Sequence, residues 1–372
     1  MSERRILHVA QPVDAGVAAV VLALASHQSS SHGQQVAVAC PPAGALPDEL
    51  RWAGVDALAW PATRGPGRAL AQEYRALRDV VRLFDPHLVH LHSSKAGLVG
   101  RLVLRGRRAT VFQPHAWSFH AARGPISAAA KSWERQAVRW SDRIIAVSAV
   151  ERNALITDPA DARIVVVHNG VDIVRFAPVS DTTSAEQRVA LGLRHDALLV
   201  VCIGRVCHQK GQDLLLDAWP NVRLACPGAQ LVVVGEGPDR ARLDARGVEG
   251  VRFFGATADV RSWFGAAVVV VAPSRWEGQS LALLEAMACG AAIVATDVSG
   301  VREALGDDAG AIVPVNDSVA LAGAVAGALT DRSWRTRVAG AARARAERLF
   351  TVASTLDAVD ALYEEVMSER AS

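Results

Sequence analysis

Short apolar runs alternate with longer segments of helical periodicity along the whole chain. Within each run the apolar residues are consecutive, which predicts strands that are buried on both faces, as in a parallel sheet covered by helices. The pattern therefore predicts an α/β fold of the doubly wound, Rossmann-like kind. Helices are expected between the strands, as at Val17–His27 and Ala69–Phe84. The strands predicted in the first half are Ile6–Ala10, Gln35–Cys40, His87–His92, Ala109–Gln113, Arg143–Val147 and Arg163–Val167.

The alternation breaks once, at Ala177–Arg188, which is polar and aperiodic and which we interpret as a linker. A chain of 372 residues exceeds the size at which one core stops growing. We therefore predict two domains facing a cleft, residues 1–176 and 197–350, a linker at 177–196, and a C-terminal helix at 351–372 that packs back on the first domain. The strands predicted in the second half are Ala197–Gly204, Gln230–Gly235, Val251–Phe254, Val268–Ala272, Ala292–Ala295 and Ala311–Val313.

Composition narrows the class of protein. Apolar residues make up 51% of the chain, yet no run approaches the roughly 18–20 apolar residues of a membrane span. The N-terminus lacks the apolar core of a signal peptide, so we expect a cytoplasmic protein. The net charge of +2 does not suggest a nucleic-acid binder. The five cysteines form no Cys-x-x-Cys pair, which favours free thiols over a zinc site.

One stretch, Arg101–Arg143, is markedly basic, with nine Lys or Arg residues against two acids, and it includes Trp117, Trp133 and Trp140. Such a stretch fits docking on an anionic membrane surface, where a lipid-linked acceptor could be presented. An ordinary solvated helix with core tryptophans fits it equally well. Both interpretations stay open from the sequence.

The strongest local signal is the segment Ser274–Gly290, SRWEGQSLALLEAMACG. Ser280 is a good N-cap for a helix over Leu281–Cys289, and Gly290 is a good C-terminal cap. The unpaired N–H groups at such a helix start favour an anion such as a diphosphate.

Two carboxylates, Glu277 and Glu285, flank the start of this helix. Helical side chains lean toward the N-terminus, so Glu285 can reach a ligand held there. The alternative is a capping glutamate, but a capping box would place it at position 283, which is Leu283.

The second signal is the Gly-flanked loop Gly204–Gly211, which carries Arg205 and Lys210 directly after a strand. A strand, a glycine-bounded loop with two cations and a helix (Gln212–Trp219) form a phosphate cradle by geometry. The chain has only three lysines among its 40 cations, so a lysine here indicates a need for a compact charge. The alternative is a solvated pair of loop cations.

In the first half, Gly16 opens the first helix and His115 follows a strand end, where open α/β sheets bind ligands. His115 has a structural alternative, since a single histidine often only packs. His90 and His92 alternate on one strand, but no third ligand is evident, and we predict no metal and no cofactor.

In this order and spacing, these residues resemble glycosyltransferase family 4, whose fold is GT-B. The likeness covers nearly the whole chain and is closest to members from high-GC bacteria. It is carried by Gly16, His90–Gly97, His115, Val147–Ser148, His168–Asp172, Gly204–Gly211, Gly235–Pro238 and the Glu277/Glu285 pair with seven residues between them.

The resemblance implies a metal-independent enzyme that retains anomeric configuration, with two Rossmann-like domains. Arg205 and Lys210 would neutralise the donor diphosphate, and Glu285 would bind the ribose. The sugar would be held by Glu277 and by Gly278, Gln279 and Ser280. His115 would lie beside the reacting sugar, and Gly16 would approach the phosphates. The family usually has Pro or Phe at the position of Gln279, and it frequently has Gly-Gly where this chain has only Gly16. These departures leave the identity of the donor sugar open.

The prediction is a glycosyltransferase that moves a hexosyl or N-acetylhexosaminyl group from a nucleotide-sugar, with UDP favoured over GDP, to a hydroxyl acceptor. That acceptor could belong to cell-envelope glycan, lipid-linked or secondary-metabolite synthesis. The alternatives are a GT-B-like sugar-nucleotide epimerase and a non-catalytic sugar-nucleotide-binding protein. A nicotinamide oxidoreductase is disfavoured because Gly235–Pro238 lacks the third glycine of the fingerprint.

Overall fold

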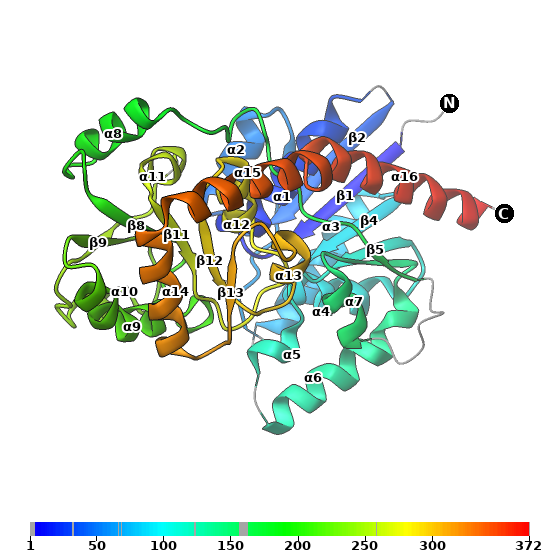
Figure 1. The fold of residues 1–372 in the computed structure, drawn as a ribbon. Helices are drawn as coiled ribbons and strands as arrows, with labels where there is room; N and C mark the ends of the chain where they lie inside the picture. Colours follow the sequence, from blue (N-terminus) through cyan, green and yellow to red (C-terminus); the bar gives the residue numbers. More distant parts are fainter. Residues whose placement is uncertain are drawn as a thin grey trace. The chain divides into compact units, whose positions relative to one another are not determined.

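A computed structural model describes residues 4–31, 33–65, 67, 69–122, 124–155, 163–257 and 259–371 (Figure 1). The chain divides into two compact units. Unit 1 comprises Met1–His168 with Thr355–Ser372, and unit 2 comprises Asn169–Ser354. Within the described residues, no helix is both long and apolar enough to cross a bilayer.

Unit 1 is built on a seven-stranded parallel sheet in the order β3-β2-β1-β4-β5-β6-β7. The chain order reverses between β1 and β4, the switch point at which open α/β sheets bind ligands. In register, His8 of β1 pairs with His90 of β4. The strands are β1 (Arg4–Ala10), β2 (Gln34–Cys40), β3 (Asp56–Ala59), β4 (Leu88–His92), β5 (Ala109–Gln113), β6 (Arg143–Ala146) and β7 (Ile164–Val166).

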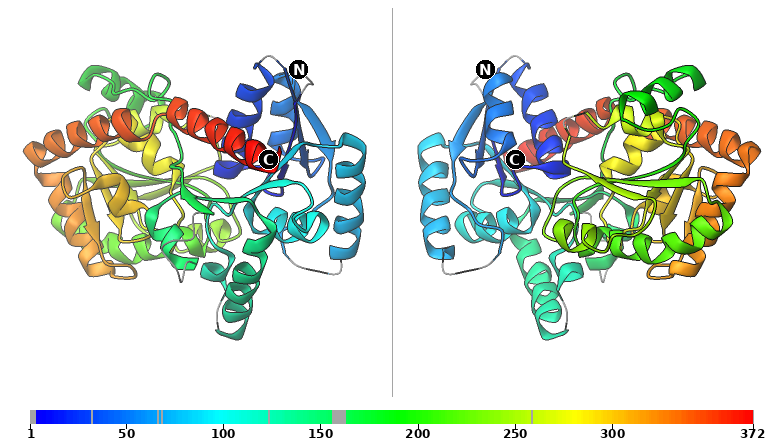
Figure 2. Two further views of the ribbon diagram at one scale, coloured as in Figure 1. Left: turned by 90° about the vertical axis from the view of Figure 1, so that its right-hand side faces the viewer. Right: turned by 90° about the vertical axis from the view of Figure 1, so that its left-hand side faces the viewer.

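Helices connect these strands, and the last helix of the chain also belongs to unit 1 from Thr355 on. Figure 2 shows α16 beside the first elements of unit 1, and the Tyr363 hydroxyl lies 2.6 Å from His90 Nδ1. The helices are α1 (Ala15–Ser29), α2 (Ala45–Trp52), α3 (Leu70–Phe84), α4 (Ser93–Leu104), α5 (Ser118–Ala121), α6 (Gly124–Ala137) with the 3-10 turn η1 (Val138–Trp140), α7 (Ala149–Leu155) and α16 (Val352–Ala371).

Unit 2 contains a six-stranded parallel sheet in the order β10-β9-β8-β11-β12-β13, so its switch point lies between β8 and β11. The strands are β8 (Leu198–Ile203), β9 (Ala229–Val234), β10 (Val251–Phe254), β11 (Val269–Ala272), β12 (Ile293–Thr296) and β13 (Ala311–Val313). The helices are α8 (Asp181–Ala190), the 3-10 turn η2 (His208–Lys210), α9 (Gln212–Ala225), α10 (Arg240–Asp244), α11 (Arg261–Ala266), α12 (Leu281–Ala288), α13 (Val301–Leu305), α14 (Ser318–Thr330) and α15 (Arg332–Leu349).

Strand β8 shows why the apolar runs are continuous. Val200 and Cys202 pack with α9 and α14 on one face of the sheet, while Leu199 and Val201 pack with α11 on the other (Figure 1). Successive side chains of a strand point to opposite faces, so a sheet covered on both sides requires apolar residues throughout. The predicted doubly wound α/β fold is confirmed.

Two predicted elements are wrong. The segment interpreted as a polar linker contains helix α8. The Ser180 hydroxyl caps this helix by accepting from the Thr183 N–H. Arg188 Nε of α8 donates to the Ala266 carbonyl of α11 at 2.8 Å. These contacts stabilise a helix that has no apolar stripe of its own.

Helix α9 was expected to end at Trp219, yet it continues through Pro220 to Ala225. Burial of Val222 in the core offsets the hydrogen bond that the proline removes.

Candidate active site

The loops that follow β8 and β11 meet at the switch point of unit 2. Gly211, at the start of α9, has φ +68°, and a Cβ there would lie only 2.0 Å from the Pro273 carbonyl oxygen. Only glycine allows both this backbone conformation and this close approach. The contact brings the cationic loop against the loop that carries Glu277.

Lys210 and Glu277 form an ion pair across these two loops, with 2.5 Å between Nζ and Oε1. The Ser274 hydroxyl donates to the same carboxylate oxygen at 2.8 Å. The Glu277 side chain is 10% exposed and that of Lys210 21% exposed, so both charges stay within reach of a ligand. The structure thus brings together two residues that the sequence placed in separate motifs.

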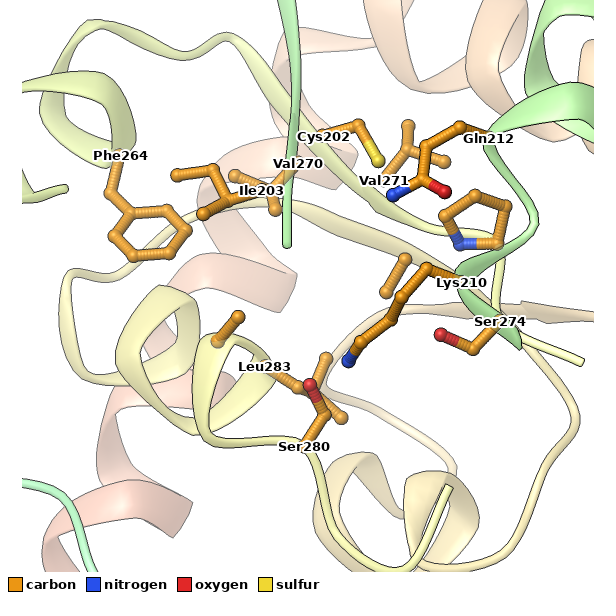
Figure 3. A pocket seen from close by; sticks show the side chains of 13 residues that line it. Cys202, Ile203, Lys210, Gln212, Phe264, Val270, Val271, Ser274, Ser280 and Leu283 are labelled. Carbon is orange, nitrogen blue, oxygen red and sulfur yellow. The ribbon is translucent and has the colours of Figure 1, made fainter. Parts of the chain in front are cut away.

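A pocket lies beside this ion pair, lined by Lys210, Gln212, Ser274 and Ser280 among apolar residues that include Leu283. Figure 3 shows Lys210 reaching from its loop toward Ser280 at the start of α12. A pocket with an apolar lining and a few convergent polar groups is the usual form of a small-molecule site.

Helix α12 begins as predicted, with Ser280 in extended conformation at the N-cap position, but the Ser280 side chain makes no capping hydrogen bond. The expectation that this hydroxyl caps the helix is therefore wrong. It lines the pocket instead. The positive end of the α12 dipole remains at the pocket for an anion.

Glu285 lies in the second turn of α12. Burial raises the pKa of this carboxyl to about 7, although the charges of Arg175 and Lys210 act in the opposite direction. A carboxylate that is poorly solvated in this way is stabilised by a ligand that donates hydrogen bonds to it. Such strongly shifted groups concentrate at functional sites.

The remaining predicted residues of unit 2 take different positions. The Arg205 guanidinium is half-buried, and its Nη2 lies 3.5 Å from Gln209 Oε1, a distance at which any hydrogen bond is weak. The buried Gln279 uses Oε1 to accept from the Asn169 N–H at 2.7 Å. This bond anchors the loop to the start of unit 2. Gly278 is buried, and its carbonyl oxygen packs against Gly300. A Cβ added to Gly300 would lie only 2.5 Å from that oxygen.

Gly16 and His115 lie in unit 1, in the segments that follow β1 and β5. Gly16 is half-buried in the first turn of α1. His115 has φ +59°, a left-handed conformation that is uncommon outside glycine and often occurs at functional sites. Its Nε2 lies 3.2 Å from His92 Nδ1, and burial lowers its pKa to about 3.

His8 is the functional candidate that the sequence analysis missed. The imidazole nitrogens of His8, His90 and His92 lie within 4.8 Å of one another, so a third imidazole does accompany the alternating pair. A histidine inside an otherwise apolar strand, Ile6–Ala10, was the available signal. Lys95, the lysine of the segment His90–Gly97, forms a buried ion pair with Glu73 at 2.8 Å and is structural.

The basic stretch Arg101–Arg143 is only partly a surface. Arg101 is fully buried, pairs with Glu134 at 2.7 Å, and stacks over the Phe112 ring, and Trp117 is buried as well. These two residues therefore do not contribute to an exposed basic face. Arg135 and Arg139 of the same stretch are exposed. Arg123 lies outside the described residues.

Comparisons with known proteins identify the class that this fold and site define. A family model described as Glycosyltransferase Family 4 matches residues 15–175, and one described as Glycosyl transferases group 1 matches residues 197–331. The lipopolysaccharide core biosynthesis mannosyltransferase LpsB of Rhizobium meliloti is 34% identical over 248 residues, which span 63% of this chain and 69% of LpsB. A D-inositol 3-phosphate glycosyltransferase of Jonesia denitrificans is 34% identical over 253 residues, which span 62% of this chain but only 58% of that relative.

Solved structures agree on the fold. Alr3699/HepE of Anabaena, solved in complex with UDP and glucose, superposes with a TM-score of 0.83 at 22% identity, covering 97% of this chain and 100% of that one. WaaG, a glycosyltransferase involved in lipopolysaccharide biosynthesis, gives a TM-score of 0.75 at 17% identity, covering 96% and 98%. The fold is GT-B. The chain belongs to glycosyltransferase family 4.

Proposed function

We propose that this protein transfers a hexosyl or N-acetylhexosaminyl group from a nucleotide-sugar, preferentially a UDP-sugar, to a hydroxyl of a glycan, lipid-linked or secondary-metabolite acceptor. The observation that carries the proposal is the pocket at the β8/β11 switch point, where the Lys210 ammonium faces the N-terminus of α12. Two positive elements in one pocket suit a diphosphate. HepE, a structural neighbour, was solved with UDP-glucose, which supports the choice of UDP.

In the proposed reaction, Arg205 and Lys210 stabilise the negative charge that develops on the departing diphosphate. Preorganised charges of this kind are usually the largest catalytic term. Lys210 would exchange its contact with Glu277 for the phosphates, which frees the Glu277 carboxylate to accept from sugar hydroxyls. Glu285 would accept from the ribose hydroxyls, which are donors that compensate for its poor solvation.

We further propose that the reaction retains anomeric configuration and needs no metal ion. The support for metal independence is that Lys210 and the α12 dipole already supply positive charge at the pocket. Retention rests on the resemblance to glycosyltransferase family 4. In a front-face displacement, the bond from the anomeric carbon to the phosphate oxygen breaks, the bond to the acceptor oxygen forms on the same face, and the leaving phosphate accepts the acceptor's proton.

Two other activities remain to be distinguished: sugar-nucleotide epimerisation and binding without catalysis. The purified protein is incubated with UDP-GlcNAc, UDP-Glc, UDP-Gal, UDP-GlcA and GDP-Man, with and without EDTA. Thermal shift and donor hydrolysis are measured for wild type and Glu285→Gln. The proposal predicts a shift and slow hydrolysis with one donor, insensitive to EDTA and lost in the variant.

Each alternative has its own signature in this experiment. An epimerase would produce an isomeric sugar without hydrolysis or acceptor, and a binding protein would give a thermal shift with no new product. Once an acceptor is found, the proton NMR coupling of the anomeric proton in the product tests retention directly. An inverted product would overturn the front-face mechanism while leaving the transferase assignment intact.

The exposed basic residues of α6 and η1 support a second, separable proposal, that this face contacts an anionic membrane. Sedimentation with anionic vesicles at low and high salt tests it. Salt-sensitive binding that is weakened in Arg135→Gln/Arg139→Gln is expected, and the absence of binding at low salt would reject it.

A further inference from the structure

Five polar side chains form a continuous series of hydrogen bonds through unit 1. Asp360 Oδ1 is 2.9 Å from Gln28 Nε2, and Gln28 Oε1 is 2.8 Å from His8 Nε2. His8 Nδ1 is 3.0 Å from His92 Nε2, and His92 Nδ1 is 3.2 Å from His115 Nε2. Gln28, His8 and His92 are fully buried, so water does not interrupt the series. It runs from α16, through α1, β1 and β4, to the loop after β5.

The direction of every hydrogen bond in this series follows from its carboxylate end. An ionised carboxylate only accepts, so Gln28 must present its NH₂ to Asp360 and its carbonyl oxygen to His8. His8 therefore donates from Nε2 and accepts at Nδ1. A neutral imidazole has one donor and one acceptor, so His92 likewise donates from Nε2 and accepts at Nδ1. His115 then carries its proton on Nε2.

We propose that Asp360, Gln28, His8 and His92 are positioning residues that hold His115 in the Nε2–H tautomer, with a lone pair on Nδ1 for a hydroxyl of the bound ligand. His115 is partly exposed, and its Nδ1 has no hydrogen-bond partner in the part of the chain that the structure describes. The carboxyl-terminal helix thus determines which kind of group the imidazole can bind.

Burial keeps the imidazoles of the series neutral. It lowers the pKa of His8 to about 4 and that of His115 to about 3, and it lowers the pKa of His92 well below the usual value. A charged imidazole would donate from both nitrogens and would end the directional series.

A metal ion held by His8, His90 and His92 is the competing explanation of the cluster. His8 Nδ1 and His92 Nε2 face each other at 3.0 Å, and both nitrogens of each of these two rings are engaged in the series. A shared metal would need a lone pair on each ring, and it would have to break the hydrogen bond between them. The observed contacts therefore favour the hydrogen-bonded series.

The functional part of this inference rests on the proposed glycosyl transfer. A lone pair on His115 Nδ1 accepts from a sugar or acceptor hydroxyl but repels a carboxylate oxygen. We therefore infer that the group bound there is a neutral hydroxyl donor, and that a hexuronate with its carboxylate at this position is disfavoured. A lost hydrogen bond of about 1.4 kcal/mol corresponds to a tenfold change in kcat/KM.

The test is the ¹⁵N NMR spectrum of the ligand-free, histidine-labelled protein, in which protonated and unprotonated ring nitrogens resonate in separate regions. The His115 signals are assigned by their loss in His115→Gln. The proposal predicts a protonated Nε2 and an unprotonated Nδ1 in wild type. In Asp360→Asn, position 360 can donate, so Gln28 can turn and the tautomers of the series can reverse; His115 should then populate Nδ1–H.

Asp357→Asn is the matched control, because it makes the same change at an exposed site one turn away on α16 and should leave the His115 signals unchanged. A protonated Nδ1 in wild type would overturn the proposal. Stoichiometric zinc in the purified protein, lost in His8→Gln, would overturn it in favour of the metal explanation. If Asp360→Asn does not fold, the wild-type spectrum and the zinc content still decide.

The activity measurement separates this inference from the proposed function. Asp360→Asn should lower kcat/KM about tenfold for a neutral donor sugar or acceptor. The ratio of kcat/KM for the neutral sugar to kcat/KM for a hexuronate should therefore decrease. Absence of turnover with any donor would contradict the proposed function, whereas the tautomer measurement does not depend on turnover. If the NMR spectrum of Asp360→Asn shows the reversed tautomer, turnover equal to that of Asp357→Asn, for neutral and hexuronate substrates alike, would contradict the role in specificity.

Discussion

The Lys210 ammonium lies 2.5 Å from Oε1 of Glu277, and this ion pair joins the loop after β8 to the loop after β11. The pair holds a cation and an anion of the pocket at fixed separation before any ligand is present. In the proposed reaction Lys210 changes partner, from this carboxylate to the donor diphosphate. The ion pair is therefore expected to matter more for turnover than for folding.

Replacing Lys210 by methionine keeps the length of the side chain and removes its charge. If the ammonium stabilises the leaving diphosphate, kcat/KM should fall by roughly 10²–10³, the cost of removing one preorganised electrostatic group. Steady-state kinetics of donor consumption measure the effect. Arg242→Met, at an exposed cation of α10, is the control and should keep wild-type kinetics. Near-normal kcat/KM in Lys210→Met would contradict the assigned role.

Substitution of Gly211 by alanine should destabilise unit 2 and impair donor binding. The added Cβ would lie 2.0 Å from the Pro273 carbonyl oxygen, in a left-handed backbone conformation. A strained residue of this kind costs on the order of 1–3 kcal/mol, and relief by separating the loops would move Lys210 from the pocket. Urea unfolding and UDP titration measure the two effects. Gly228→Ala, where the Cβ meets open space, should change neither.

Glu285→Gln should make the ligand-free protein more stable while it abolishes donor binding. Burial raises the pKa of Glu285 in the folded protein to about 7, whereas the pKa of this carboxyl in the unfolded chain is 4.5. Between these two pH values the carboxyl is ionised in the unfolded chain but still protonated in the folded protein. Stability is therefore lost as pH rises from about 4.5 to 7, and at pH above 7 the ionised group costs on the order of 1–3 kcal/mol. Urea unfolding at about pH 8 should show a gain for the variant. A loss at that pH would contradict the environment described for Glu285.

The four buried or half-buried imidazoles predict sensitivity to mild acid. The pKa values of His8, His90, His92 and His115 are all lowered by burial, so below about pH 6.5 the unfolded chain takes up protons that the folded protein cannot. Each imidazole then lowers the free energy of unfolding by about 1.4 kcal/mol per pH unit, until the pH reaches its folded-state pKa.

Two carboxyls act in the opposite direction over part of this range, because burial raises the pKa of Glu151 and of Glu285 to about 7. Four imidazoles against two carboxyls leave a net loss. Urea unfolding should therefore give a lower free energy of unfolding at about pH 5 than at about pH 6.5. A free energy that stays constant or rises over this interval would show that the imidazoles are not held neutral by the fold.

Most of the architecture follows from local pattern, because strands covered on both faces need continuous apolar runs. All six strands predicted in unit 2 are present, with ends that move by a residue. Strand β3, Asp56–Ala59, was missed because it is a short edge strand with no buried residue and thus carries no continuous apolar signal. Helix α8 was missed because it has no apolar stripe of its own. The Ser180 cap was a local signal that was overlooked, and the contact of Arg188 with α11 is one that no local pattern encodes.

The site was predictable where a motif follows a strand end and was not where distant strands meet. The Gly204–Gly211 loop and the segment around Glu277 both follow strands of the switch point, and the structure joins them through Lys210. His8 could not be assigned, because its partners come from α1 and β4, and only the sheet register places it beside His90. The Ser280 hydroxyl shows the converse error, since a good capping residue need not cap.

The most direct test of the central claim is calorimetric titration of the protein with UDP in the presence of EDTA. We expect one UDP site per chain, with binding lost in Arg205→Ala/Lys210→Ala and retained in Arg242→Ala. Binding of UDP that is unchanged in the double variant, or that appears only when a divalent metal is added, would contradict the assignment of the β8/β11 pocket as a metal-independent diphosphate site.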